Sequence, residues 1–215
     1  MIKHPTTEKW CYPVNYIFSK RRKLIQLGAA LPIAIPASLL MNQAMAGTTQ
    51  LQPTTPCSTP VKTTRKQTAG PFFTPNTPLK RSFRDDSADG KPLDLIGFVQ
   101  TPDCRPIANA VIELWHADAQ GRYDNQGYSM RGHQFTDSTG RFSFETIVPG
   151  RYPGRTLHYH VIIAPSGAPA LTTQLYFPDD RDNDRDWIFD KRLVLDISLN
   201  AGIEIGRFDF VVEAG

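Results

Sequence analysis

Short β-rich runs separated by turn sequences are the feature that most restricts the fold of this chain. The runs are four to seven residues long, and Pro-Asp, Asp-Ser-Thr-Gly and Pro-Ser-Gly sequences, which favour turns, stand between them. No segment has the sustained period of about 3.6 residues that marks an amphipathic helix. Several short strands at this spacing predict an all-β fold, a β-sandwich of short antiparallel strands with long functional loops. The predicted strands are residues 95–100, 110–115, 141–144, 157–163, 171–177, 193–198 and 208–212.

Residues 1–46 have the organisation of an export signal peptide. A charged region with paired arginines at residues 19–23 precedes an apolar run at residues 27–40, and residues 44–46 supply the small residues that a signal peptidase reads. The paired arginines resemble a twin-arginine signal, and an ordinary secretory signal or an uncleaved anchor is the alternative. We expect cleavage after Ala46, a periplasmic or extracellular location, and no stable membrane span after processing.

The positive net charge of the chain comes from this same segment. The chain has 24 Lys and Arg against 21 Asp and Glu, but residues 1–46 hold six of the basic residues and one of the acids. The remaining 18 basic and 20 acidic residues give the rest of the chain a net charge of −2. Because the remainder has no basic stripe, we expect no nucleic acid partner.

An extended N-terminal arm is predicted between the signal and the β-rich region. Residues 47–68 are rich in Thr, Pro and Gln and poor in apolar groups, so they have no core of their own, and the β-sandwich domain follows as residues 69–215. Cys57 in the arm and Cys104 in a turn remain after the signal, and an oxidising compartment favours their pairing. A disulfide would attach the arm to the domain; two unrelated thiols are the alternative.

An acidic segment at residues 179–186 resembles a calcium-binding loop at first sight. Its sequence, Asp-Asp-Arg-Asp-Asn-Asp-Arg-Asp, lacks the central Gly and the terminal Glu of an EF-hand loop. We therefore predict a solvated loop. Elsewhere, Arg122 and Arg151 are interpreted as partners in structural ion pairs.

Two histidines have the spacing of a metal site. His158 and His160 lie one residue apart in a predicted strand, so both side chains point to the same face. Imidazole is the commonest metal-binding side chain. The other two histidines after the signal, His116 and His133, are interpreted as polar residues of loops or strand ends. By itself, the His-x-His pattern also describes two surface histidines.

Two tyrosines strengthen the prediction of a metal site. Tyr152 stands between Gly150 and Pro153 in a turn that leads into the strand, where a turn residue can aim its side chain back over the strand. Tyr123 lies in the loop after a predicted strand that ends at Trp115, itself interpreted as a core residue. Two phenolates and two imidazoles would form a site whose hard, anionic oxygens fit ferric iron better than zinc.

Six segments carry motifs that occur together in a fixed order: residues 110–115, 121–123, 136–144, 149–153, 158–160 and 172–177. In combination, over roughly residues 68–212, they resemble the intradiol ring-cleavage dioxygenases, the family of catechol and protocatechuate 3,4-dioxygenases. The resemblance implies insertion of both atoms of O2 into a catecholic ring between its hydroxylated carbons, giving a cis,cis-muconate-type diacid. It implies a catecholic small molecule and O2 as partners. Because family members commonly associate, a homo-oligomer is among the states expected.

The resemblance also assigns the ligands of a non-haem Fe(III) ion. Tyr123 would be the permanent tyrosinate ligand. Tyr152 would be the axial ligand, which is released when substrate binds. His158 and His160 would complete the set of protein ligands.

Two further roles follow from the resemblance. Arg155 would be catalytic, lying near the substrate ring and stabilising its developing negative charge, and Gln174 would be a polar residue near the substrate. The chain departs from the family pattern at Ala69, where Glu is common, and at Gly154, where protocatechuate enzymes carry a bulky Trp. These departures leave the substrate open.

Two other classes of protein compete with the enzyme. Transthyretin-like and adhesin-type β-sandwich modules, which are non-enzymatic binding modules, also contain Gly-x-Phe-x-Phe and Pro-Gly-x-Tyr motifs such as residues 140–144 and 149–152. They do not require Tyr123, His158 and His160 together. The other alternative is an exported copper- or zinc-binding protein that uses the two histidines alone.

Overall fold

The computed structural model describes residues 59–87 and 89–214. The predicted signal at residues 1–46, residues 47–58 of the predicted arm and Cys57 lie outside the described residues, so the signal and the disulfide stay predictions. Within the described ranges, no helix is long and apolar enough to cross a membrane.

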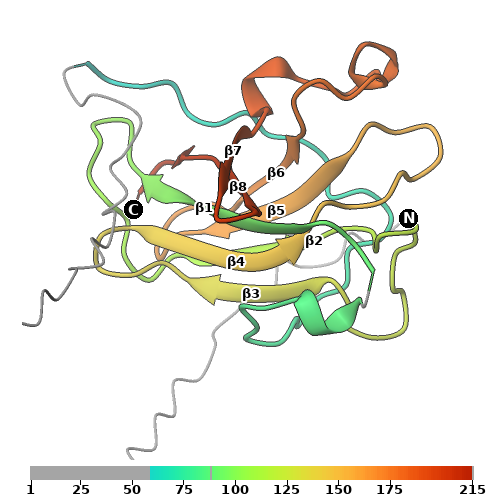
Figure 1. Ribbon diagram of the computed structural model, residues 1–215. Helices are drawn as coiled ribbons and strands as arrows, with labels where there is room; N and C mark the ends of the chain where they lie inside the picture. Colours follow the sequence, from blue (N-terminus) through green and yellow to red (C-terminus); the bar gives the residue numbers. More distant parts are fainter. Residues whose placement is uncertain (1–58, 88, 215) are drawn as a thin grey trace, which may run out of the picture. The chain divides into compact units, whose positions relative to one another are not determined.

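Strands and short 3-10 helices are the regular elements of the described residues. The strands are β1 (Pro92–Gln100), β2 (Val111–Trp115), β3 (Arg131–Phe135), β4 (Arg141–Ile147), β5 (His158–Ala164), β6 (Leu171–Tyr176), β7 (Asp196–Asn200), β8 (Ile203–Arg207) and β9 (Phe210–Val211). The 3-10 helices are η1 (Arg84–Asp86), η2 (Asn183–Arg185) and η3 (Lys191–Leu193). One sheet has the order β4-β1-β8-β7, with β9 paired to β1, and the other has the order β3-β2-β5-β6. The predicted all-β sandwich is confirmed (Figure 1).

Two details of the strand prediction are corrected. Strands β3 and β8 were not expected: β3 reads Arg-Gly-His-Gln-Phe, which has no apolar alternation, and the alternation of β8 is limited to Ile-Glu-Ile before a glycine. The predicted strand at residues 193–198 begins instead as η3, and β7 starts only at Asp196. Most pairings are antiparallel as expected, but β1 runs parallel to both β8 and β9.

The core lies between the two sheets. Alternate apolar residues of β1 and β4, among them Leu95 and Phe144, face those of β2 and β5, among them Ile112 and Val161, and all are almost fully buried. Burying one such side chain stabilises the fold by about 1.5–3 kcal/mol. The core therefore holds the strands that carry the candidate site in fixed positions.

The register of the second sheet brings residues from three strands together. Trp115 at the end of β2 is paired with His160 on β5, and His160 is paired with Gln174 on β6. His158 is paired with Tyr176 in the same way. Residues that are far apart in the sequence thus lie side by side at one end of this sheet.

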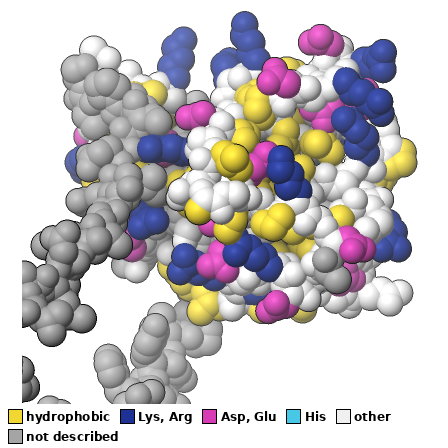
Figure 2. Space-filling view, in the orientation of Figure 1, with side chains coloured by type: hydrophobic (Ala, Val, Ile, Leu, Met, Phe, Trp, Pro, Cys, Tyr) yellow, Lys and Arg dark blue, Asp and Glu magenta, His cyan; other side chains and the backbone are white. Residues whose placement is uncertain are grey.

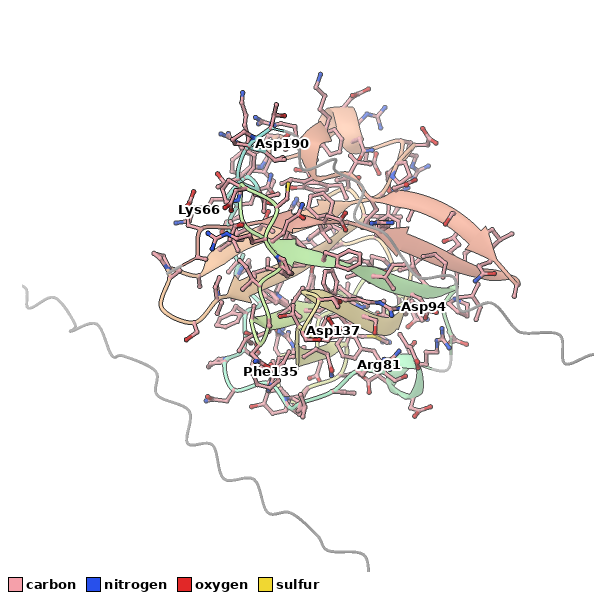
Figure 3. All side chains as sticks on the ribbon, turned by 90° about the vertical axis from the view of Figure 1, so that its left-hand side faces the viewer. Lys66, Arg81, Asp94, Phe135, Asp137 and Asp190 are labelled. Carbon is pink, nitrogen blue, oxygen red and sulfur yellow. The ribbon has the colours of Figure 1, made fainter. Side chains whose placement is uncertain are left out.

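The described part of the arm, residues 59–68, is extended and runs along the edges of the sheets. The amide of Val61 donates to Pro102 O at 2.9 Å, beside the turn that carries Cys104, and that of Gln67 donates to Thr172 O at 2.8 Å. Arg65 Nε lies 3.6 Å from a carboxylate oxygen of Asp190. Figure 3 labels Asp190 and Lys66, the next residue of the arm. These contacts guide the arm towards the end of the sheet that carries the histidines.

Charges of both signs are mixed on the molecular face shown in Figure 2. Lys and Arg side chains are interspersed with Asp and Glu, and apolar side chains lie between them. Among the residues drawn in colour, this face has no continuous basic stripe.

Candidate metal centre

The two tyrosines lie on loops whose backbones touch. Gly121, two residues before Tyr123, has φ +81°, and a Cβ atom there would lie 2.0 Å from the carbonyl oxygen of Arg151. A Cβ atom on Gly150 would lie 2.3 Å from the backbone nitrogen of Gly121. Only glycine permits this approach and this positive φ without strain. The loop after β2 and the loop between β4 and β5, which carries Tyr152, are therefore in direct contact.

Three donor atoms converge beside these loops. The hydroxyl oxygen of Tyr123 lies 3.1 Å from His158 Nε2, which lies 3.2 Å from His160 Nε2. Two ligand atoms about 2.1 Å from a shared metal ion, at right angles or slightly wider, are about 3.0–3.2 Å apart. The spacing thus fits one metal ion. In the described part of the chain, no group of three His, Cys, Asp or Glu side chains could hold a metal, so such a site needs tyrosine.

His158 presents a free lone pair at this point. Its Nδ1 lies 2.7 Å from the carbonyl oxygen of Thr156, which can only accept a hydrogen bond. Nδ1 must therefore carry the proton and Nε2 the lone pair. Burial, reinforced by the charge of Arg155, lowers the pKa of His158 to about 4. The ring is thus neutral near pH 7, the form in which imidazole binds metals.

His160 is held by packing. Its ring stacks on Trp115 with centroids 5.0 Å apart and planes 6° apart. Burial, followed by the influence of His158 and Arg155, lowers the pKa of His160 well below its usual value, so this ring is neutral too. Nδ1 makes no hydrogen bond of good geometry with the described residues, although the backbone of Thr68 is close enough to oppose the fall in pKa.

Tyr123 is the third donor, and its phenol needs a cation before it can ionise. Its ring stacks on Phe72, with centroids 4.5 Å apart and planes 17° apart. Burial raises the pKa of Tyr123 far above its usual value, although Arg155 and Arg131 act in the opposite direction. Without metal, the protonated phenol can donate to Nε2 of His158. A bound cation would replace that proton and stabilise the phenolate.

Tyr152 lies at the rim of this cluster. Its ring is half-buried and meets the Tyr123 ring at 78°, with centroids 5.7 Å apart, and it also contacts Phe72. In the described hydrogen bonds, its hydroxyl does not join the Tyr123, His158 and His160 donors. The structure thus brings three of the four predicted ligands into contact and puts the fourth beside them.

Arg155 and Gln174 are joined as a fixed pair. Arg155 donates to Gln174 Oε1 at 2.7 Å, and Gln174 Nε2 donates to the carbonyl oxygen of Thr68 in the arm at 2.9 Å. On its other side, Arg155 Nε donates to Asp186 Oδ2 at 2.7 Å. The guanidinium is therefore held from two directions.

A family model described as Dioxygenase matches residues 68–212, more than half of the chain. The chain belongs to the intradiol dioxygenase family. Similar proteins include the 6-chlorohydroxyquinol 1,2-dioxygenase of Cupriavidus pinatubonensis, 28% identical over 88% of this chain and 75% of the relative. The chlorocatechol 1,2-dioxygenase of Pseudomonas sp. strain P51 is 27% identical, over 97% of this chain and 88% of the relative.

Solved structures agree with this family. The dioxygenase domain of a dioxygenase carbohydrate-binding protein fusion from Streptomyces sp. SirexAA-E has a TM-score of 0.69 and 42% identity, over 72% of this chain and all of that chain. The 3-chlorocatechol 1,2-dioxygenase of Rhodococcus opacus 1CP has a TM-score of 0.63 and 29% identity, over 69% of this chain and 72% of that chain.

The acidic segment of this intradiol dioxygenase is not the solvated loop that its composition predicts. The carboxylates of Asp180 and Asp186 are only 1% exposed and pair with Arg151 and Arg155, respectively. Burial would raise the pKa of Asp180, but the backbone amide of Asp182 and the Arg151 guanidinium outweigh it and lower the pKa. Arg151 and Arg155, just before a predicted buried strand, were the sequence signal for these buried carboxylates, because an unpaired charge is unfavourable in a buried position.

Three further residues make contacts that the sequence did not predict. Tyr176 donates to Gln67 Oε1 at 2.6 Å, and Gln67 Nε2 donates to the carbonyl oxygen of Ile188 at 2.7 Å, so the arm and the acidic loop meet here. Burial chiefly raises the pKa of Tyr176 to about 12. His116 directly follows the last residue of β2, at a strand end as expected, but it is 1% exposed and its Nε2 lies 2.6 Å from Thr146 Oγ1.

Proposed function

We propose that this chain is a non-haem Fe(III) dioxygenase that inserts both atoms of O2 into a catechol between its hydroxylated carbons, giving a cis,cis-muconate-type diacid. The observation that carries the proposal is the meeting of Tyr123 Oη, His158 Nε2 and His160 Nε2, with neighbouring donors 3.1–3.2 Å apart. Relatives named for catechols and hydroxyquinols support the substrate class. A β-sandwich binding module would leave the convergent donors without a role.

The donor set favours iron over zinc or copper. Tyr123, Tyr152, His158 and His160 would hold the ion, with two anionic oxygens and two neutral nitrogens. Hard phenolate oxygens favour a trivalent ion. When bound, the iron supplies a Lewis-acid centre that binds the deprotonated catechol and promotes its reaction with O2.

Tyr152 is proposed as the ligand that moves a proton. It is half-buried at the rim and makes no hydrogen bond to the donor atoms of Tyr123, His158 and His160 in the described structure, whereas both histidines are buried. Its phenolate oxygen would be the proton acceptor, taking one of the two protons that the catechol loses. The displaced ring has space beside it, because Tyr152 also lines a surface cleft.

Arg155 is proposed to stabilise negative charge on the substrate ring. Asp186 and Gln174 hold its guanidinium before substrate arrives, so little reorganisation is needed during the reaction. Gln174 in turn has its amide orientation fixed by the carbonyl oxygen of Thr68. The arm is thus proposed to keep both polar groups in place, and Gly70, two residues after the arm, lies over His160, because a Cβ atom on Gly70 would be 3.2 Å from His160 Cε1.

The first experiment measures iron content, the visible spectrum and oxygen uptake with catechol. Phenolate-to-iron charge transfer should colour the protein, and Tyr123→Phe should remove most of that colour. Tyr128→Phe is the matched control, because Tyr128 is 39% exposed and its hydroxyl reaches only Pro75 O at 3.3 Å in the described structure. A protein that stays colourless and inactive after iron reconstitution would show that the proposal is wrong.

We also propose that the protein is exported through its twin-arginine signal. The proposal rests on the paired Arg21 and Arg22 before the apolar run. Replacing both by Lys should leave the precursor in the cytoplasm, which fractionation and immunoblotting can detect. Unchanged export would indicate an ordinary secretory signal.

A further inference from the structure

A cleft of about 450 Å³ opens on the outer side of Tyr152 and Arg155. Its walls are formed by residues 151–155, which include the turn before β5, and by residues of the 182–186 segment in the loop after β6. Pockets of about 300–1,000 Å³ accommodate drug-sized ligands, which are much larger than one catechol ring. The cleft therefore has room for more than the ring that is cleaved.

Gly154 leaves one wall of this cleft bare. It has φ +78°, and a Cβ atom built on it would have no other atom within 4 Å. Gly121, in contrast, is enclosed by backbone atoms. The absence of a side chain at Gly154 thus leaves open space next to Tyr152, whereas at Gly121 it permits a close backbone contact.

The outer wall of the cleft carries an incompletely neutralised cation. Arg155 is paired with the buried carboxylate of Asp186, and Arg151 is in contact with Asp182 and with a second carboxylate. Arg185 has an 81% exposed side chain and lies 3.5 Å from Asp182, so it shares this carboxylate with Arg151. Asp182 also lies 3.7 Å from Arg181 Nε, so three arginines share this one carboxylate, whereas Arg151 has Asp180 as a further partner. An anionic or strongly hydrogen-bond-accepting group is thus favoured near Arg185.

We propose that this cleft is a substrate subsite for an extended ring substituent ending in a carboxylate. The favoured substrates would be dihydroxyphenyl-alkanoates and dihydroxycinnamates, with the ring at Tyr152 and Arg155, the chain over Gly154 and the carboxylate at Arg185. This inference rests on the proposed catechol dioxygenase function. It assigns specificity to Gly154 and Arg185, which touch neither the three converging donor atoms nor each other in the contacts described.

The test compares catechol, 4-methylcatechol, 3-(3,4-dihydroxyphenyl)propionate and the methyl ester of that acid. Both kcat/KM in air and Kd under anaerobic conditions are measured with the iron-loaded protein. The acid should exceed catechol in kcat/KM by about tenfold, as expected for a filled pocket. The ester should lose up to about fivefold relative to the acid, which is the range of an exposed ion pair.

Two variants locate the effect in the cleft. Gly154→Asn fills the bare wall, and Asn tolerates a positive φ better than most residues. The ratio of kcat/KM for the acid to that for catechol should then fall about tenfold. Arg185→Gln, a change to an exposed side chain that does not threaten folding, should reduce the difference between acid and ester to nearly nothing.

Gly202→Asn is the matched control, because Gly202 has φ +84° and equally open surroundings but lies in the β7–β8 turn. In this variant, the ratio of kcat/KM for the acid to kcat/KM for catechol should equal that of the wild type. Equal kcat/KM for all four substrates, or a ratio that neither cleft variant changes, would overturn the subsite while leaving the dioxygenase function intact. If no substrate is cleaved, catechol included, both proposals fail.

Discussion

Replacing Asp186 by Asn should lower the free energy of unfolding by about 3 kcal/mol, because it removes the charge that compensates Arg155. The Asp186 carboxylate is 1% exposed, the Arg155 side chain is 16% exposed, and the two groups approach to 2.7 Å. Two unit charges about 4 Å apart attract by about 4 kcal/mol at an effective dielectric constant of about 20. The expected loss is smaller than this attraction, because the side-chain oxygen of Asn can still accept a hydrogen bond from the backbone N–H of either Thr156 or Ile188.

A double-mutant cycle of the metal-free protein measures this pair directly. Urea unfolding of Asp186→Asn, Arg155→Gln and the double variant should give a coupling energy of about 2–3 kcal/mol. Asp190→Asn is the control, because its partners Arg192 and Arg65 are 58% and 60% exposed and Asn can keep the helix cap of η3. The control should lose less than about 1 kcal/mol.

The reasoning is refuted by a coupling energy below about 0.5 kcal/mol, the range in which distant sites simply add. Equal losses for Asp186→Asn and Asp190→Asn would refute it too, because they would mean that burial of the pair contributes nothing.

Three further predictions concern other parts of the protein. Gly121→Ala should lower the free energy of unfolding by about 3 kcal/mol or more, because its Cβ atom would clash with backbone. Gly202→Ala, where φ is similar but the surroundings are open, should lower it by about 1 kcal/mol. Thermal unfolding measures both. Burial lowers the pKa of His116 from 6.5 to about 4, so the unfolded chain binds a proton more readily than the folded protein. The free energy of unfolding should therefore fall by up to about 3 kcal/mol as the pH drops from 6.5 to 4. His116→Gln should make the free energy of unfolding less dependent on pH in this range. The predicted Cys57–Cys104 disulfide should block alkylation of both thiols until reductant is added, and full alkylation without reductant would disprove it.

The strands that the sequence predicted are those in which apolar residues alternate. Residues 141–144 read Arg-Phe-Ser-Phe, and the two phenylalanines are buried in β4 as that pattern requires. Strand β3, the last strand of its sheet, has no such pattern and is held by backbone hydrogen bonds to β2 on one side and to residues 78–80 on the other. Edge strands of this kind depend on a partner that local sequence does not reveal.

The candidate site was predictable to the extent that local spacing sets geometry. His158 and His160 share a face because strand residues alternate, and the resemblance added Tyr123 from another loop. Asp186 was missed because its partner Arg155 lies 31 positions away, and nothing in an acidic run distinguishes a buried carboxylate from a solvated one. Gln67 was missed for the same reason, since its role depends on how the arm docks against β6.

The contact between Gly121 and Gly150 limits how Tyr152 could ever leave a metal. The amide of Gly150 also donates to the carbonyl oxygen of Asp118 in the other loop at 2.8 Å, so the two loops cannot separate unless this hydrogen bond breaks. A departing Tyr152 would have to turn about its own side-chain torsions while the main chain stays still. Exposed side chains rotate in picoseconds to nanoseconds, whereas loops move in nanoseconds to microseconds. Release of Tyr152 would then be a rotamer change rather than the opening of a loop.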